Sequence, residues 1–488
     1  MNKRFVICAA LSLLVCCSMA QQPEKKEKRE RPAGKQGGGG GGRRAYPSPA
    51  QAWKVATISR GCPEKDRITM SIYPAADLEG YIEYGNERTA VQPLPAKTPT
   101  QLTLTGLSAD TDYAYRLRYR NPGETDFQTG PDYRFHTARA PGKPFVFEIQ
   151  GDSHPERIGK QNDPVLYEQT LLAVAKDRPD FFLCIGDDFS ADKLPEVNAQ
   201  TVRQAYLKQL PYLGLFAHST PLFLVSGNHE QASRANLDGT PDNVAVWAQN
   251  SRNSLFPQPA PDGFYSGDTE EVEHIGLLRD YYAWTWGDAL FVTIDPYWHS
   301  EVAVDNKFGG GEKRRDLWNI TLGDAQYQWL KKTLEESTAK YKFVFAHHVN
   351  GTGRGGARIA NLYEWGGENQ QGQNEFKARR PGWELPIHQL MAKNKVTIFF
   401  QGHDHIFARE ELDGVIYQTL PDPANTNPVP SNAKAYPGAD IFPNSGRVRV
   451  SVGPEKVQVE YVASRLPKDS TAEHPDGEII FKYEVPLQ

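Results

Sequence analysis

Five short apolar runs between residues 144 and 425 each lead directly into aspartate, asparagine or histidine side chains. Short, fully apolar runs are typical of strands that are buried on both faces of a sheet. The ends of such strands meet at one edge, where α/β folds place their ligand sites. We therefore expect a fold that gathers these polar residues in one crevice. The runs are FVFEIQ before GDSH, FFLCI before GDD, PLFLVS before GNHE, KFVFA before HH, and VTIFFQ before GHDH.

Amphipathic segments alternate with these runs. Apolar spacing predicts helices at residues 165–176, 324–336 and 385–393, and Asp163 with Pro164 supplies an N-cap and a first helical residue for the first of them. We therefore expect residues 144–488 to form an α/β domain whose sheets are covered by helices. The runs RVRVSV, KVQVEYV and EIIFKYEV near the C-terminus are predicted to complete a sheet of this domain. The polar segments 231–280 and 299–322, rich in Gly, Pro and aromatic residues, are predicted to be loops over the active face.

Residues 48–140 have a different pattern, with short alternating runs separated by turn signals. This spacing predicts a small antiparallel β-sandwich. The stretch LTGLSADTDYAYRLRYR resembles the tyrosine-corner strand of fibronectin type III domains, with Tyr113 or Tyr115 as the corner residue. The segment has no pattern of metal ligands or nucleophiles, so its predicted role is structural.

The N-terminus carries an export signal. Lys3 and Arg4 precede an apolar stretch, and residues 18–20 read Ser-Met-Ala, a cleavage pattern of small residues. We interpret residues 1–20 as a signal peptide and the charged, glycine-rich residues 21–47 as a flexible linker. The apolar stretch is shorter than the roughly 20 residues that span a bilayer, so we predict no transmembrane segment. The mature protein is expected to be periplasmic or secreted, with a lipid anchor at Cys17 as an alternative.

Composition excludes some classes of protein. A net charge of -5 argues against a nucleic-acid partner, which normally requires a basic surface. Beyond the leader only Cys62 and Cys184 remain, too few for a disulfide scaffold. Cys184 lies inside an apolar run and is predicted to be a small core residue.

The polar residues after the five apolar runs have the chemistry of metal ligands. Imidazole combined with carboxylate oxygen suits iron, zinc or manganese better than calcium. The candidates are too many for one tetrahedral ion, which favours two ions sharing a carboxylate. His348 is an alternative to its neighbour His347. The predicted ligands are Asp152, His154, Asp187, Asn228, His347, His403 and His405.

Several residues near the predicted ligands are candidates for binding substrate or for supporting the ligands. Arg354 and Arg358 lie in a glycine-rich segment, where a guanidinium could reach a substrate phosphate, and a solvated role is equally open. Asp188, Glu230 and Asp404 flank the predicted ligands and are expected to support them. His274, His299 and His388 are isolated in the sequence, and surface or helix positions are expected for them.

Along residues 144–425 the motifs D-x-H, G-D, G-N-H-E, H and G-H-x-H follow one another in this order. Both the motifs and their order resemble those of the calcineurin-like metallophosphoesterase superfamily. The expected N-terminal domain and the GHDHIFAR motif look most like the purple acid phosphatase branch and its bacterial relatives. That branch has an iron-binding tyrosine where Ser190 stands here, and it lacks a histidine corresponding to His154. We therefore expect a metal centre without the purple colour. The resemblance implies a four-layer catalytic domain, a β-sandwich flanked by helices.

The resemblance also implies roles for the site residues. Asp187 would bridge two metal ions, and His229 would protonate the leaving group. The implied function is an exported, acid phosphatase-like enzyme that hydrolyses small phosphate monoesters through a metal-bridging hydroxide. The alternatives are a phosphodiesterase acting on nucleotides or phospholipid head groups and, less favoured, a non-catalytic binding or adhesion protein. The first ion would be held by Asp152, His154 and His405, and the second by Asn228, His347 and His403.

Overall fold

The computed structural model describes residues 47–304, 316–351 and 353–487. The predicted signal peptide, the Cys17 alternative and all but the last residue of the predicted linker lie outside the described residues. Within the described part of the chain, no helix has both the length and the apolar character needed to cross a membrane.

The N-terminal region consists of strands in two sheets that share one apolar core. Ile58 and Ile72 from one sheet pack with Ile82 and Leu117 from the other. This β-rich region confirms the coarse prediction for the segment. The first sheet contains β1 (Ala56–Gly61), β2 (Arg67–Pro74) and β6 (Thr100–Thr105). The second contains β3 (Leu78–Tyr84), β4 (Glu87–Arg88), β5 (Gln92–Leu94), β7 (Asp112–Arg120), β8 (Gln128–Thr129) and β9 (Tyr133–His136).

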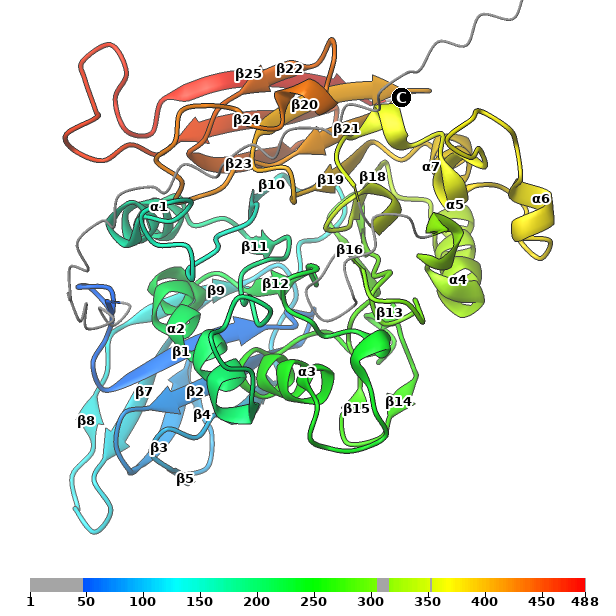
Figure 1. Ribbon diagram of the computed structural model, residues 1–488. Helices are drawn as coiled ribbons and strands as arrows, with labels where there is room; N and C mark the ends of the chain where they lie inside the picture. Colours follow the sequence, from blue (N-terminus) through cyan, green and yellow to red (C-terminus); the bar gives the residue numbers. More distant parts are fainter. Residues whose placement is uncertain (1–46, 305–315, 352, 488) are drawn as a thin grey trace, which may run out of the picture. The chain divides into compact units, whose positions relative to one another are not determined.

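The C-terminal region, from residue 145 onward, is built on two larger sheets. In the first, β10, β11 and β12 are parallel, and β10 pairs antiparallel with β23 from the far end of the chain. Figure 1 shows the orange strand β23 beside the cyan strand β10, with the red strand β25 at the edge of the sheet. The C-terminal runs therefore complete a sheet of this domain, as predicted. The order of the first sheet is β12 (Leu222–Leu224), β11 (Phe181–Cys184), β10 (Phe145–Gln150), β23 (Gly446–Val452), β24 (Lys456–Ala463) and β25 (Ile479–Pro486).

The second sheet contains the parallel strands β17, β18, β19 and β21 with antiparallel strands at its edges. Beside it, β14 (Glu271–Val272) and β15 (Gly276–Leu277) form a small hairpin. The order of the sheet is β13 (Ser266–Gly267), β16 (Tyr282–Trp286), β17 (Ala289–Thr293), β18 (Tyr341–Phe345), β19 (Ile398–Gln401), β21 (Val415–Thr419), β20 (Phe407–Leu412) and β22 (Asp440–Phe442).

Aromatic side chains fill the space between the two sheets. The Phe291 ring centroid lies 5.3 Å from that of Phe147 and 5.0 Å from that of Phe181, both of the opposite sheet. Phe291 also stacks on Trp284 at 4.9 Å. These rings are almost fully buried and belong to one continuous core. Because the core joins strands from both sheets, it fixes the two sets of strand ends relative to each other.

Helices cover the outer face of each sheet, and each helical layer has its own apolar core. Asp163 caps α1 by accepting from the N–H groups of Val165 and Leu166, as the sequence predicts. Figure 1 shows α1 and α2 on one side of the sheets and α4, α5 and α7 on the other. The helices are α1 (Pro164–Asp177), α2 (Ala199–Ala217), α3 (Val244–Leu255), α4 (Gly323–Glu336), α5 (Tyr363–Gly366), α6 (Phe376–Arg379) and α7 (Ile387–Lys393). Short 3₁₀ turns occur at Arg234–Asn236, Leu317–Asn319, Val349–Gly351, Ala357–Ile359 and Ala433–Ala435.

The prediction that residues 231–280 are loops is wrong for α3. Its sequence, VAVWAQNSRNSL, is rich in Asn and Ser, which favour turns in isolation. Here Asn243 caps the helix, and the buried side chains of Gln249 and Arg252 bond to the carbonyls of Leu278 and Leu224. Tertiary hydrogen bonds thus stabilise a helix that its local sequence does not favour.

The N-terminal strands dock on the C-terminal region through hydrogen bonds to main-chain carbonyls. Tyr115 Oη donates to the carbonyl of His218 at 2.6 Å, and Ser59 Oγ donates to the carbonyl of Leu255 at 3.2 Å. In the opposite direction, Tyr265 Oη donates to the carbonyl of Pro63 at 2.6 Å. The two regions therefore form a continuous packed unit.

Replacing Phe291 by alanine should destabilise the protein by about 3–5 kcal/mol, because it removes a ring that joins the two sheets and leaves a cavity. Val165→Ala is the control, since Val165 is 63% exposed on α1, and its effect should stay within about 0.5 kcal/mol. Urea unfolding of the two variants tests the difference. Equal stabilities would contradict a core shared by both sheets.

Candidate metal centre

The predicted ligands lie together in the structure, at the carboxyl ends of strands from both sheets. Asp152 and His154 follow β10, and Asp187 follows β11. His347 follows β18 of the other sheet, and Asn228 follows β12. His403 and His405 follow β19, and all seven residues are buried. The crevice is thus formed where the two sheets meet.

A first group of donor atoms surrounds Asp152. Its Oδ2 atom lies 3.0 Å from Nε2 of His405 and 3.5 Å from Nε2 of His154. The two imidazole nitrogens are 3.3 Å apart. Three donor atoms this close to one another can bind a single ion.

A second group surrounds Asn228. Its Oδ1 atom lies 3.1 Å from Nε2 of His347 and 3.1 Å from Nδ1 of His403. Asp187 lies between the two groups, with Oδ2 3.2 Å from His347 Nε2 and 3.8 Å from His154 Nε2. One carboxylate therefore faces donor atoms of both groups.

The backbone is strained where it presents these ligands. His154, Asp187, His403 and His405 have φ angles of 41°, 60°, 65° and 55°. Non-glycine residues rarely adopt this left-handed region, and such conformations concentrate at functional sites. Each turn aims a side chain into the crevice directly after its strand ends.

Glycines before the ligands allow the close approach that the sequence suggested. A Cβ atom on Gly186 would lie 2.7 Å from His347 Nδ1, and one on Gly402 would lie 2.5 Å from Asp152 Oδ1. A Cβ atom on Gly227 would collide with the Asp187 carboxylate. Only glycine fits at these positions without moving a ligand.

Glu230 connects two of the turns that carry candidate ligands. Its carboxylate accepts hydrogen bonds from the backbone N–H groups of Asp187, Asp188 and Gly227 at 3.1, 2.7 and 2.8 Å, and from that of Phe189 at 3.0 Å. Asp404, between His403 and His405, accepts from Gly355 N and Arg354 Nη1 and so connects its turn to that segment. Asp188 accepts from Ser153 and Gln150. These three residues therefore hold the backbone and side chains next to the candidate ligands.

Carboxylates and carbonyls also orient the imidazole rings. His347 Nδ1 lies 2.8 Å from the carbonyl oxygen of Ile185, so it donates there and leaves Nε2 facing the crevice. His154 Nδ1 lies 3.1 Å from Glu156 Oε1, and His405 Nδ1 lies 3.2 Å from Asp422 Oδ2. Such pairs fix the ring and increase its basicity as a ligand.

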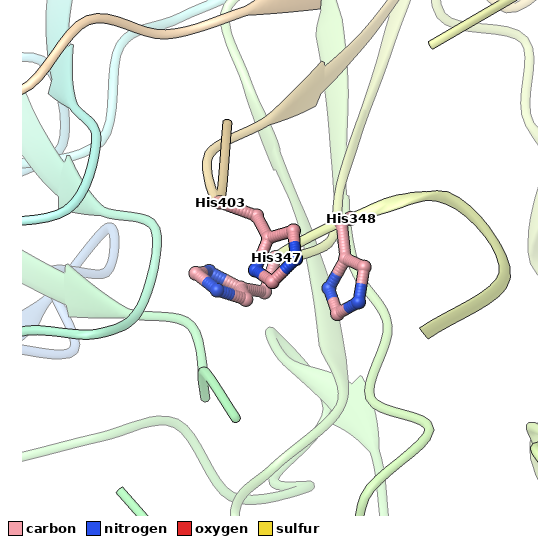
Figure 2. Close-up of side chains that lie close together, drawn as sticks. All are labelled: His347, His348 and His403. Carbon is pink, nitrogen blue, oxygen red and sulfur yellow. The ribbon is translucent and has the colours of Figure 1, made fainter. Parts of the chain in front are cut away.

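His348, the alternative to His347, packs against the ring of His403. Figure 2 shows the imidazoles of His347, His348 and His403 gathered at the ends of β18 and β19. His348 stacks on His403 at 4.0 Å, and its Nδ1 lies 3.2 Å from the hydroxyl of Tyr297. His347, in contrast, faces both Asp187 and Asn228. The geometry therefore favours His347 as the ligand of the second group.

The charges of the centre match a pair of cations. Burial alone would raise the pKa of Asp187, yet the imidazoles of His347 and His229 lower it well below its usual value. Burial alone would lower the pKa of His347, and the carboxylates of Asp187 and Asp152 raise it to about 10. Oδ2 of Asp152 and Oδ2 of Asp187 are buried without a well-directed hydrogen bond from any described residue. Buried carboxylate oxygens of this kind are suited to bind metal ions placed between them.

His229 and Arg157 lie together at the mouth of the centre. His229 Nδ1 is 2.7 Å from Asp192 Oδ1, and its Nε2 is 2.9 Å from Nη2 of Arg157 and 3.8 Å from Asp187 Oδ2. Arg157 also pairs with Glu156 at 3.0 Å. Sequence reasoning missed Arg157, and the only available signal was its position three residues after His154.

The arginines predicted to bind substrate occupy different environments. Arg354 is 45% exposed and is held by the Asp404 carboxylate at 2.9 Å, next to His403. Arg358 is exposed and lies in a 3₁₀ turn whose neighbouring residue Ala357 bonds to Glu410. The structure thus places Arg354 beside the centre and gives Arg358 no contact with a candidate ligand among the described contacts.

The expectation for the isolated histidines is wrong for His299. His274 is exposed, and His388 lies on α7, although its side chain is buried. His299 is neither helical nor exposed, because its side chain is only 9% accessible and pairs with the buried Asp280.

Comparisons with known proteins agree with this centre. The family model described as calcineurin-like phosphoesterase matches residues 149–407, more than half of the chain. The chain therefore belongs to the calcineurin-like phosphoesterase family. It is a hydrolase of phosphoester bonds and, like its family, metal-dependent.

The structure of PhoD shares the fold, and other solved structures show weaker similarity. The structure of PhoD is 15% identical, with a TM-score of 0.61 over 88% of this chain and 90% of that one. GAP50 of Plasmodium, the anchor in the inner membrane complex, is 11% identical with a TM-score of 0.40, over 71% of this chain and 89% of that one. A putative 5'-nucleotidase from Staphylococcus aureus is 15% identical with a TM-score of 0.34, over 71% of this chain and 54% of that one. No curated protein matches the sequence.

Gly402→Ala should release metal and abolish most activity, because the new Cβ would displace the Asp152 carboxylate. Gly382→Ala is the matched control, since a Cβ atom there would meet no described atom within 4 Å. Elemental analysis of both purified variants measures the effect. Normal metal content in Gly402→Ala would show that the turn is not a ligand scaffold.

Proposed function

We propose that this protein is an exported two-metal phosphoesterase that prefers phosphate monoesters. The observation that carries the proposal is the position of Asp187 Oδ2 between the two groups of donor atoms, 3.2 Å from His347 Nε2 and 3.8 Å from His154 Nε2. A carboxylate in that position suits the bridging ligand of a bimetal centre. Asp152, His154 and His405 would hold one ion, and Asn228, His347 and His403 the other.

When bound, the two ions would polarise the phosphate and lower the pKa of the attacking water. The side chains supply the other requirements. His229 is suited to protonate the leaving group from Nε2 once Arg157, which can only donate to that nitrogen, turns to the substrate phosphate, because Asp192 holds Nδ1 and Nε2 lies 3.8 Å from Asp187 Oδ2. Its side chain is 14% exposed, whereas those of His154 and His347 are fully buried.

Arg157 supports the preference for monoesters. A monoester carries a second negative charge, which requires a further cation beside the metal ions. The guanidinium of Arg157 is 20% exposed and contacts the proposed acid His229. Arginine binds phosphate oxygens through two parallel hydrogen bonds, so this position suits a terminal phosphate.

Two further parts of the proposal rest mainly on the sequence. Export rests on the leader at residues 1–20, and Cys17 remains the alternative lipid attachment position. We also propose a fibronectin type III-like identity for the N-terminal sheets. It is supported by the hydroxyl of Tyr113, which accepts from the N–H of Ser108 at 2.8 Å, as in a tyrosine corner.

Asp187→Asn should lower hydrolysis of p-nitrophenyl phosphate by more than about 100-fold and reduce metal content, because the amide bridges two cations poorly. Asp126→Asn, at an exposed position far along the sequence from the ligands, is the control and should behave as wild type. The measurements are elemental analysis and the rates on the monoester and on its bis ester. A faster rate on the bis ester would favour a diesterase, and no metal with no activity would favour a binding protein.

Arg157→Met should lower kcat/KM for the monoester about 30-fold, as expected from the loss of about 2 kcal/mol of charge-assisted hydrogen bonding. The bis ester should be affected much less, because it lacks the second charge. Arg358→Met, in which an exposed arginine is lost, is the control. Equal losses on both esters would remove Arg157 as the source of monoester preference.

A further inference from the structure

Three ionisable side chains outside the catalytic centre lie close together at the edge of the second sheet. Asp268 follows β13, Asp280 precedes β16, and His299 lies in the turn after β17. Asp268 is 4% exposed and Asp280 fully buried, and the His299 side chain is 9% exposed. One donor atom from each lies within 4.8 Å of the other two. None of the three is among the candidate ligands of the catalytic ions.

Two carboxylate oxygens in this cluster receive no well-directed hydrogen bond from the described residues, and the Asp268 carboxyl lies against the Asp280 carboxyl and the Tyr281 hydroxyl. Asp268 Oδ1 accepts from the N–H of Glu270 at 2.9 Å, and Asp280 Oδ2 lies 2.9 Å from His299 Nε2. The remaining oxygens, Asp268 Oδ2 and Asp280 Oδ1, are buried and receive no well-directed hydrogen bond from a described donor. A buried carboxylate oxygen without a partner costs free energy unless a cation or a proton satisfies it.

The two carboxyl groups repel each other when both are ionised. Burial and the neighbouring Asp280 raise the pKa of Asp268 to about 7. Burial would also raise the pKa of Asp280, but its hydrogen bond with His299 lowers it. The nearby guanidinium of Arg234 is paired with Glu270 at 2.7 Å. Burial would lower the pKa of His299, but its hydrogen bond with Asp280 raises it. A divalent cation bound here would replace the imidazole proton and balance the two carboxylates.

The backbone holds the pair in place. The N–H of Asp268 donates to the carbonyl of Tyr281 at 3.1 Å, and Gly267 pairs with Tyr282 across the antiparallel strands. A Cβ atom on Gly267 would collide with the Tyr281 carbonyl, so only glycine permits this close approach. The ring of His299 lies 5.4 Å from that of Tyr281. The donors are thus positioned before any ion binds.

We propose that Asp268, Asp280 and His299 form a second, structural metal site that binds a borderline divalent cation such as Zn²⁺ or Mn²⁺. Two carboxylate oxygens with one imidazole nitrogen suit these ions, whereas Ca²⁺ prefers oxygen alone. The ion would connect the β13–β16 edge to the turn after β17. That turn also carries Tyr297, whose hydroxyl contacts His348 beside the catalytic centre.

The direct test uses wild-type crystals grown with Zn²⁺ and anomalous diffraction data. A peak bounded by Asp268, Asp280 and His299, in addition to any in the catalytic centre, is the expected result. Density at the catalytic ligands with none at this cluster would overturn the proposal and assign a shared proton to the carboxyl pair. This measurement needs no variant and does not depend on which ester the enzyme hydrolyses.

A solution test compares Asp268→Asn/Asp280→Asn with Asp126→Asn/Asp132→Asn, whose positions are exposed. The cluster variant should bind about one metal equivalent less per chain than the control, and it should lose part of the rise in Tm that Zn²⁺ produces. Its hydrolysis of p-nitrophenyl phosphate should remain measurable, since the catalytic ligands are intact. Equal metal content in the two variants would overturn the proposal. If the double variant does not fold, His299→Gln provides the same comparison with a smaller change.

Discussion

Burial of the Asp187 carboxylate is the constraint on which the rest of the centre depends. An ionised carboxylate in the interior loses its hydration, at a cost of several kcal/mol, unless positive charge and hydrogen bonds compensate. Here the compensation comes from both sheets: His347 follows β18, His154 follows β10, and the N–H of His229 donates to Asp187 Oδ1 at 2.8 Å. Neither sheet alone could supply this environment. The aromatic core around Phe291 is therefore as necessary to the centre as the ligands are.

The sequence predicts the parts of this structure that are encoded locally. Apolar runs identify β10, β11, β12, β18 and β19, because strands buried on both faces require apolar residues throughout. The ligands could be proposed because they follow those runs directly, with glycine before most of them. The helix α1 could be recognised from Asp163 and Pro164 for the same reason, since capping depends on adjacent residues.

Other features depend on residues far apart in the chain and could not be predicted. Arg157 and His229 are 72 positions apart, and only the fold places Nη2 of one 2.9 Å from Nε2 of the other. His299 and Asp280 come together across β16 and β17, so an isolated histidine in the sequence becomes a buried, paired one in the structure. The helix α3 forms because Gln249 and Arg252 find carbonyl partners outside it. In each case the decisive partner is distant in the sequence.

The contacts that join the N-terminal strands to the catalytic region have a further consequence for evolution. Tyr115, Ser59 and Tyr265 all donate to main-chain carbonyls, and Gln101 donates to the carbonyl of Asn253 at 2.8 Å. Every residue type has a carbonyl, so substitutions at His218, Leu255, Pro63 and Asn253 leave the acceptor in place. The acceptor positions, which occur on both sides of this interface, can drift in sequence, while the donor positions must retain their hydroxyl or amide groups. The two regions can therefore remain docked in homologues whose acceptor residues have diverged.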